Sequence, residues 1–179
     1  MPLLEVLTRC YKRPKMLAVN MASLDAQTCD DWEQTLLVDD VGRGIGWSYT
    51  NMAAQAADLN GDYIWILDDD DECIRSTLVA ELKGIVEAHN PDVIMVKMDH
   101  QERGILPNAQ WGCEPKQGDI GCSAYIVKRE VWQQHAGHFG AHYAGDFDFI
   151  KAIFASGATV YWHDVIASRV QRISLGAAE

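Results

Sequence analysis

The chain has 179 residues, of which 48% are hydrophobic, and a formal net charge of -11. This length and apolar content suit one domain with a substantial core, so we expect residues 1–179 to form a single domain. A chain this acidic lacks the clustered Lys and Arg that bind phosphate backbones, which excludes nucleic acid as its main partner.

The cysteines and the amino-terminal residues point to a cytoplasmic protein. The five cysteines include no C-x-x-C pair, so we expect reduced thiols and no structural zinc site. The opening "MPLLEVLTRCYKRP" has no apolar stretch long enough for a signal peptide, and no run approaches the length of a membrane span.

The first half of the chain is predicted to alternate strands and helices. After a strand at Leu3–Thr8, Pro14 suits the first turn of a helix whose Leu17, Met21 and Leu24 share one face. Such alternation is typical of an open α/β sheet with right-handed crossovers. The further elements expected in this half are strand Thr35–Val38, helix Trp47–Leu59, strand Tyr63–Leu67, helix Ser76–His89 and strand Val93–Met98.

The second half is less regular. Residues 99–121 are rich in Gly, Pro and polar residues without a period, which predicts a long loop region of the kind that is usually functional or mobile. Beyond it we expect a strand at Ser123–Lys128, a helix at Phe147–Ala155 and a short strand at Thr159–Trp162. The tail from Ser168 onward is expected to be poorly ordered.

Two acidic clusters follow predicted strands, at Asp39-Asp40 and at residues 68–71. Ligands of open α/β sheets bind outside the carboxyl ends of the strands, so both clusters should face one crevice. Neighbouring carboxylates repel one another unless a cation offsets their charge, and Mg²⁺ or Mn²⁺ prefers such oxygen ligands. Strand geometry would direct Asp68 and Asp70 to one side and Asp69 to the other.

A structural alternative exists for the acidic run. Acids that follow a strand are often solvated, and Asp71 or Glu72 is a candidate cap for the next helix. The glycine-rich "GRGIGW" is interpreted as a flexible loop, because Trp47 stands where a dinucleotide-binding fingerprint needs glycine.

Several motifs in order resemble glycosyltransferase family 2, whose members have the GT-A fold. The matching segments are "VLTRCYKRP", "WEQTLLVDD" and "GIGWSYTNMAAQAADLNGDYIWILDDDD". The resemblance implies a Rossmann-like three-layer α/β sandwich with a mostly parallel central sheet. It further implies a nucleotide-binding half at about 1–98, an acceptor and catalytic half at about 99–165, and a tail at 166–179.

The resemblance also implies roles for residues of the first half. Asp68 and Asp70 match the D-x-D pair, with Asp70 in direct metal contact and Asp68 nearer the ribose or sugar. Asp69 and Asp71 are supporting candidates. The other residues implied to contact the nucleotide sugar are Thr8, Arg9, Asp39 and Asp40. The arginine at the diphosphate is Arg9, Arg13 or Arg43, and the sequence does not choose among them.

In the second half, "HYAGDFDFIKAIFASGATVYW" resembles the family segment that supplies the catalytic base. Asp146 matches the second acid of that segment, but Gly145 replaces the first, so the base is left open between Asp146 and Asp148. His163 lies where related enzymes place a metal or diphosphate ligand. Trp111 is either a platform for a sugar ring or a core residue.

The function implied is that of a hexosyltransferase that needs Mn²⁺ or Mg²⁺. It would move a sugar from a nucleotide diphosphate, with UDP favoured, to a hydroxyl of a saccharide, lipid or protein, with inversion at the anomeric carbon. Two alternatives stay open: a Mg²⁺-dependent phosphoryl-transfer domain, either phosphatase or receiver-like, and a non-catalytic sugar-nucleotide-binding module.

Overall fold

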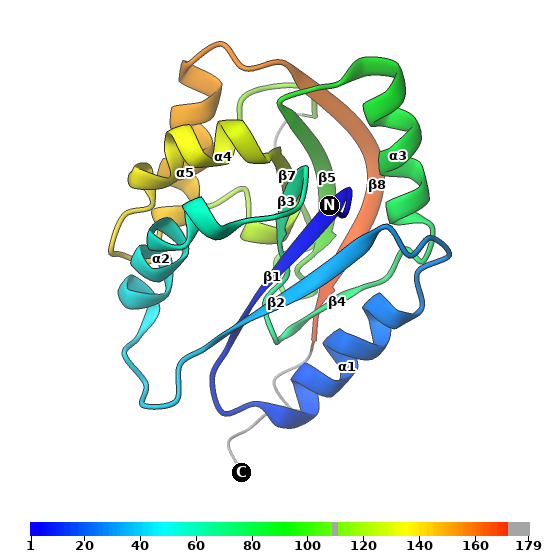
Figure 1. Ribbon diagram of the computed structural model, residues 1–179. Coiled ribbons are helices and arrows are strands. Elements are labelled where there is room, and N and C mark those ends of the chain that lie inside the picture. The colour runs from blue at the N-terminus through cyan, green and yellow to red at the C-terminus, as the bar shows by residue number, and fades with distance from the viewer. Residues whose placement is uncertain (109–110, 172–179) are drawn as a thin grey trace.

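A twisted sheet forms the centre of the molecule in the computed structural model, which describes residues 1–108 and 111–171 (Figure 1). Its strands lie in the order β2-β1-β3-β7-β5-β8-β4, and β6 pairs with β5 outside this path. Strands β1, β2, β3, β5 and β8 run in one direction, while β4, β6 and β7 run against them. The strands are β1 Leu4–Cys10, β2 Trp32–Val38, β3 Tyr63–Ile66, β4 Asp71–Cys73, β5 Val93–Asp99, β6 Ile105–Leu106, β7 Tyr125–Lys128 and β8 Val160–Val170.

Helices cover both faces of the sheet, which gives the three-layer α/β sandwich expected from the sequence (Figure 1). One face carries α1 (Pro14–Asp25) and α3 (Leu78–His89), and the other carries α2 (Ile45–Ala54), α4 (Arg129–His135) and α5 (Gly145–Ala155). Single 3-10 turns lie at Ala56–Asp58, Cys122–Ala124 and Ala136–His138.

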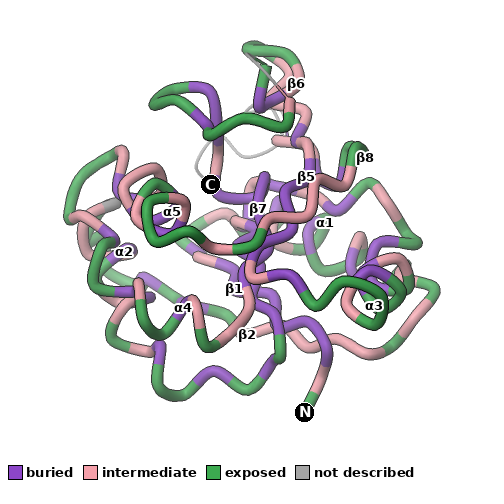
Figure 2. Tube along the Cα trace, turned by 90° about the horizontal axis from the view of Figure 1, so that it is seen from above, coloured by how far each residue is buried: buried purple, intermediate pink, exposed green. Residues whose placement is uncertain are grey.

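Each face of the sheet has its own hydrophobic core, because successive side chains of a strand point to opposite faces. Strand β3 illustrates this: Ile64 and Ile66 pack with the α2, α4 and α5 side, whereas Tyr63 and Trp65 pack with the α1 and α3 side. The buried residues therefore run through the middle of the molecule, between two exposed outer layers (Figure 2).

The parallel pairing brings the carboxyl ends of the first three strands to one edge. Cys10 pairs with Val38 of β2, and Leu7 pairs with Ile66 of β3. Two backbone bonds extend these ladders, from the amide of Asp39 to the carbonyl of Cys10 (2.9 Å) and from the amide of Asp69 to the carbonyl of Arg9 (3.2 Å). Both acidic clusters thus lie at this edge.

The acidic run itself differs from expectation. After a turn closed by a bond from the amide of Asp71 to the carbonyl of Asp68 (2.8 Å), the chain continues as strand β4, antiparallel to β8. Asp71 and Glu72 are therefore strand residues and not helix caps, and α3 begins later, after Thr77. Because the chain turns here, strand alternation does not decide which way residues 68–70 point.

The end of the described chain is also more ordered than expected. Strand β8 runs from Val160 to Val170, far beyond the expected end at Trp162, because its last residues pair with β4. The prediction of a poorly ordered tail is wrong for Ser168 to Gln171, and both of these residues are buried. Residues 172–179 lie outside the described residues.

Three helices differ from the predicted pattern. Helix α1 buries Met16, Asn20 and Leu24 in place of the expected face with Leu17 and Met21. Helix α2 ends at residue 54 and α4 was not expected at all. Within the described ranges, no helix combines the length and the apolar character needed to cross a membrane.

Candidate active site

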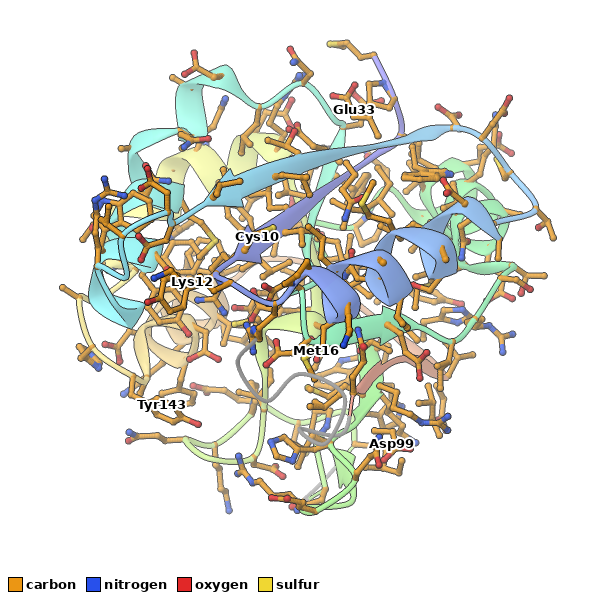
Figure 3. All side chains as sticks on the ribbon, turned by 90° about the horizontal axis from the view of Figure 1, so that it is seen from below. Cys10, Lys12, Met16, Glu33, Asp99 and Tyr143 are labelled. Carbon is orange, nitrogen blue, oxygen red and sulfur yellow. The ribbon has the colours of Figure 1, made fainter. Side chains whose placement is uncertain are left out.

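Two cavities open at the edge where β1, β2 and β3 end. The first has a volume of about 310 Å³ and the second about 320 Å³. Arg9, Asp68 and Asp70 line both, so they form a common wall between them. Figure 3 looks onto this side of the molecule, with Cys10 and Lys12 near the middle and Tyr143 toward the rim.

The first cavity lies between the β1 end and the loop after β2. Its remaining lining residues are Cys10, Tyr11, Arg13, Asp39, Gly42, Gly44 and Ser48. The second cavity lies between the acidic turn, the segment before β7 and the start of α5. Its remaining lining residues include Tyr49, Asp71, Met98, His100, Arg103, Gln117, Gly121, Cys122, Tyr143, Asp146 and Phe147.

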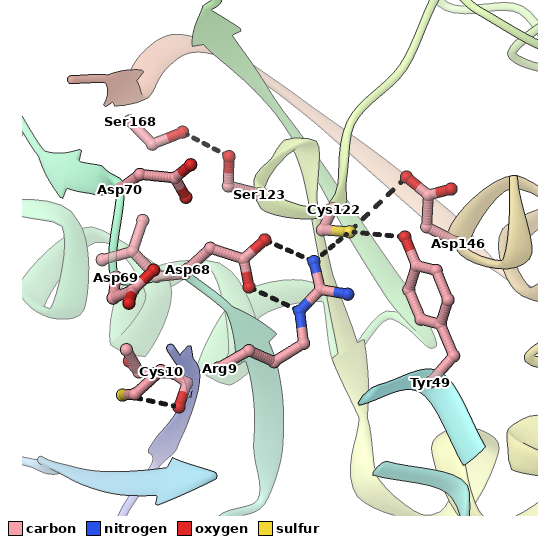
Figure 4. A network of polar contacts seen from close by, with 12 residues as sticks. Arg9, Cys10, Tyr49, Asp68, Asp69, Asp70, Cys122, Ser123, Asp146 and Ser168 are labelled. Carbon is pink, nitrogen blue, oxygen red and sulfur yellow. Dashed lines mark hydrogen bonds and ion pairs between the residues drawn. The ribbon is translucent and has the colours of Figure 1, made fainter. Parts of the chain in front are cut away.

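Two arginines neutralise part of the acidic turn. The guanidinium of Arg9 holds Asp68 with two bonds, one of them from Nε to Oδ1 at 2.6 Å (Figure 4). The guanidinium of Arg13 bridges Asp69 and Asp70. Bidentate and bridging contacts of this kind are among the stronger polar interactions in proteins, so they fix the directions of the three carboxylates.

Two buried amide side chains hold the backbone of the acidic turn from behind. The amide nitrogen of Asn20 donates to the carbonyls of Asp68 (2.9 Å) and Asp71 (3.0 Å). That of Gln171 donates to the carbonyls of Met16 (3.0 Å) and, more weakly, of Asp71 (3.3 Å). Sequence reasoning missed both residues, although a polar Asn20 between two apolar positions of a helix face was the available signal.

The charges of the turn match the needs of a divalent cation. Residues 68–71 supply four carboxyl groups against the two guanidinium groups of Arg9 and Arg13, so the acids outnumber the cations by two. Burial, together with the charges of Asp68 and Asp70, raises the pKa of Asp71 well above its usual range. Burial raises the pKa of Asp70, and the nearby charge of Asp68 raises it further. Burial also raises the pKa of Asp69 to about 6. A cation would relieve this repulsion.

The donor set fits an open metal site rather than a closed one. Among residues 1–108 and 111–171, no three His, Cys, Asp or Glu side chains are grouped to hold an ion by themselves. Asp70 and Asp68 would be the protein ligands of Mn²⁺ or Mg²⁺, and water and phosphate oxygens would complete its shell, as is usual for Mg²⁺.

The structure separates the two candidate bases. Asp146 lies in the first turn of α5 and lines the second cavity, where burial raises the pKa of its carboxyl. Asp148 is 45% exposed and its Oδ2 lies 2.8 Å from Nε2 of His142. Only Asp146 is brought together with the acidic turn in the cavity that they share.

The other residues expected at the nucleotide divide in the same way. Asp39 lines the first cavity, and its Oδ1 accepts a bond from the amide of Gly42 at 2.8 Å. Asp40 is 74% exposed and contacts Arg43. Thr8 is fully buried, its hydroxyl accepts a bond from Gln34 (2.7 Å), and it lines neither cavity.

His163 and Trp111 lie away from both cavities. On β8, Nε2 of His163 lies 2.7 Å from Oε2 of Glu81 in α3, so the structure does not bring this histidine to the acidic turn as a metal ligand. Trp111 packs edge-on against Trp162 with their ring centroids 5.0 Å apart. This contact favours the core interpretation of Trp111.

Comparisons with known proteins bear on the fold. No protein-family model matches the chain, and no curated protein matches it by sequence. Its fold is similar to that of S. aureus TarS 1–349, with a TM-score of 0.72 and 14% identity over 98% of this chain and 62% of that one. The chain has the GT-A fold.

Further solved structures agree with this assignment. TarS 1–349 in complex with UDP-GlcNAc matches with a TM-score of 0.71 and 12% identity, over 96% of this chain and 59% of that one. The mannosyltransferase PcManGT from Pyrobaculum calidifontis, in complex with GDP-Man and Mn²⁺, matches with a TM-score of 0.65 and 13% identity, over 93% of this chain and 57% of that one. This GT-A chain thus spans about three fifths of the length of these solved chains.

Proposed function

We propose that the chain is a glycosyltransferase that moves a sugar from a nucleotide diphosphate, with UDP favoured, to an acceptor hydroxyl. The observation that carries the proposal is the common wall of the two cavities, formed by Arg9, Asp68 and Asp70. A nucleotide in the first cavity would direct its diphosphate toward this wall, and an acceptor in the second would approach from the side of Asp146. The bound ligands of TarS (UDP-GlcNAc) and of the mannosyltransferase (GDP-Man) support a nucleotide-diphosphate sugar as donor, and that of TarS supports UDP as its nucleotide.

The base in this proposal is Asp146. Its carboxylate would take the proton of the acceptor hydroxyl while that oxygen attacks the anomeric carbon opposite the leaving diphosphate, which inverts the configuration. A raised carboxyl pKa suits this role, because a general base works best when its pKa lies near the working pH. Arg9 contributes a fixed positive charge close to the donor side.

A divalent cation at Asp70 and Asp68 would be Mn²⁺ or Mg²⁺, and its chemistry when bound is to stabilise the charge of the diphosphate leaving group. The two aspartates would hold the cation, while Arg9 and Arg13 keep their carboxylates in place. The bound Mn²⁺ of the mannosyltransferase structure supports this part of the proposal.

Binding and turnover of UDP-GlcNAc test the proposal with paired variants. In calorimetry, UDP should bind in the presence of Mn²⁺, and Asp70→Ala should abolish that binding. Asp146→Asn should retain UDP binding but lower the Mn²⁺-dependent turnover of UDP-GlcNAc by about 10²- to 10⁴-fold, the usual contribution of a general base. The exposed Asp148→Asn is the matched control and should behave as wild type. If Asp148→Asn loses turnover while Asp146→Asn keeps it, Asp148 and not Asp146 is the base.

A further inference from the structure

We propose that Cys122 is a positioning residue for the transfer reaction, because its thiol links the carboxylate of Asp146 to the guanidinium group of Arg9. The inference rests on the proposed function, since it takes Asp146 as the base and Asp68 as a donor-side acid. It assigns a role in the reaction to a buried thiol that touches both halves of the site (Figure 4).

The contacts form a continuous path between the two cavities. Nη2 of Arg9 donates to Sγ of Cys122 at 3.5 Å, and this sulfur lies 3.4 Å from Oδ2 of Asp146. A thiol is both a weak donor and a weak acceptor, so one sulfur can accept from the guanidinium and donate its proton to the carboxylate. With the Arg9–Asp68 pair, the path joins β1, the segment after β3, the turn before β7 and α5.

The start of this path is rigid. Arg9 holds Asp68 through two nitrogens, and its guanidinium lies over the ring of Tyr49 at 4.7 Å from the centroid. The Tyr49 hydroxyl is also 3.7 Å from the sulfur of Cys122. Cys122 itself is only 8% exposed. The guanidinium group of Arg9 is thus held in place and in turn holds the thiol of Cys122. The thiol then holds Oδ2 of Asp146, the proposed base.

The carboxylate of Asp146 depends on the thiol because it has few other donors. Its Oδ1 accepts from the backbone amide of Phe147 at 2.9 Å, whereas Oδ2 has the thiol of Cys122. The titratable or charged groups that face Asp146 from neighbouring elements are Cys122, Arg9, Tyr49 and Tyr125. Burial raises the pKa of Asp146, and the thiol bond opposes this rise because it favours the ionised carboxylate.

Variants of Cys122 test the proposal. We expect Cys122→Ala to lower kcat for Mn²⁺-dependent UDP-GlcNAc hydrolysis by about ten- to a hundred-fold. Without the thiol, the carboxylate of Asp146 is no longer held in the position from which it accepts the proton. The acid limb of its pH profile should move to higher pH, while the Kd for UDP stays unchanged. Cys122→Ser, which restores a donor, should recover most of kcat.

The control is Cys73→Ala, which removes another buried thiol, one that contacts Gln27 and the carbonyl of Arg75 on the opposite side of the sheet. It should leave kcat and the pH profile unchanged. A general loss of packing would instead lower the melting temperature of both variants without moving the pH profile of either.

A second measurement keeps this proposal separate from the proposed function. Carbon-13 NMR titration of the Asp146 carboxyl, assigned with Asp146→Asn, should give a higher pKa in Cys122→Ala than in wild type, whether or not a sugar nucleotide binds. Failure of the wild type to bind UDP with Mn²⁺ would refute the proposed function alone. An unchanged Asp146 titration and pH profile in Cys122→Ala would overturn the role of Cys122 while the function stands.

Discussion

Removal of the Asn20 side chain is the sharpest test of how the acidic turn is held. Asn20 is fully buried in α1, donates to the carbonyls of Asp68 and Asp71, and accepts a bond from Gln34 at 2.7 Å. Asn20→Ala removes the bonds to all three partners at a position that is fully buried. The turn that carries Asp68 and Asp70 would then be free to move.

The expected magnitude follows from these three bonds. At about 1 kcal/mol for each hydrogen bond, the free energy of unfolding should fall by about 3 kcal/mol. For a chain of this size, 1 kcal/mol corresponds to about 2–4 °C in the melting temperature, so Tm should fall by about 6–12 °C. The Kd for UDP in the presence of Mn²⁺ should rise as well, because the carboxylates lose their fixed directions.

Thermal and urea unfolding measure the first effect, and calorimetry with UDP and Mn²⁺ measures the second. Met21→Ala is the control: it lies one residue away on the same helix, is 42% exposed, and should change stability by no more than about 0.5 kcal/mol. If Asn20→Ala lowers Tm by less than about 2 °C and leaves the affinity for UDP unchanged, the role given to this amide is refuted.

Three further predictions concern other parts of the chain. His163→Ala should keep the Mn²⁺-dependent affinity for UDP and lose only about 1 kcal/mol of stability, since the His163 side chain contacts Glu81. Weaker UDP binding by this variant would show that His163 belongs to the binding site after all. Gly42→Ala should destabilise the protein by about 1 kcal/mol, because the φ angle of Gly42 is +82° and an added Cβ would meet the Tyr11 hydroxyl. Gly84→Ala, on an open helix face, should instead stabilise the protein by about 0.5–1 kcal/mol. Equal changes in the free energy of urea unfolding for the two variants would contradict this. Burial raises the pKa of Asp69 from 3.8 to about 6, so its contribution to stability is present below about pH 4 and is lost as the pH rises through about 6; Asp69→Asn should flatten this part of the curve, and an unchanged curve would count against the raised pKa.

Much of the architecture could be predicted from local patterns. The wholly apolar stretch before Asp68 predicted a strand buried on both faces, and β3 is buried at every position. The paired acids after β2 and β3 predicted a common edge, which the parallel pairing with β1 provides. Both inferences needed only the side-chain period of a strand and the geometry of parallel sheets.

The features that were missed depend on contacts distant in sequence. Strand β4 exists because it pairs with β8, nearly a hundred residues later, and no local pattern of "DEC" indicates a strand. The same pairing orders Gln171, which looked like part of a loose tail. The contacts of Cys122 with Arg9 and Asp146 likewise depend on tertiary packing, since nothing next to this residue in the sequence connects it to either of them.

The candidate site residues separate for the same reason. Asp146 and Asp148 are both aspartates in the first turn of α5, but two positions along a helix differ by about 200° in direction. One therefore faces the cavity and the other faces His142. The division of the chain near residue 98 into nucleotide and acceptor halves remains a prediction.

The central claim is that Asp68 and Asp70 bind a nucleotide diphosphate with the help of a divalent cation. Calorimetric titration of the chain with UDP, once with Mn²⁺ and once with EDTA, tests it most directly. We expect binding with Mn²⁺, none with EDTA, and none for Asp70→Ala under either condition. Equal binding of UDP with Mn²⁺ and EDTA, or no binding of UDP or GDP at all, would contradict the claim.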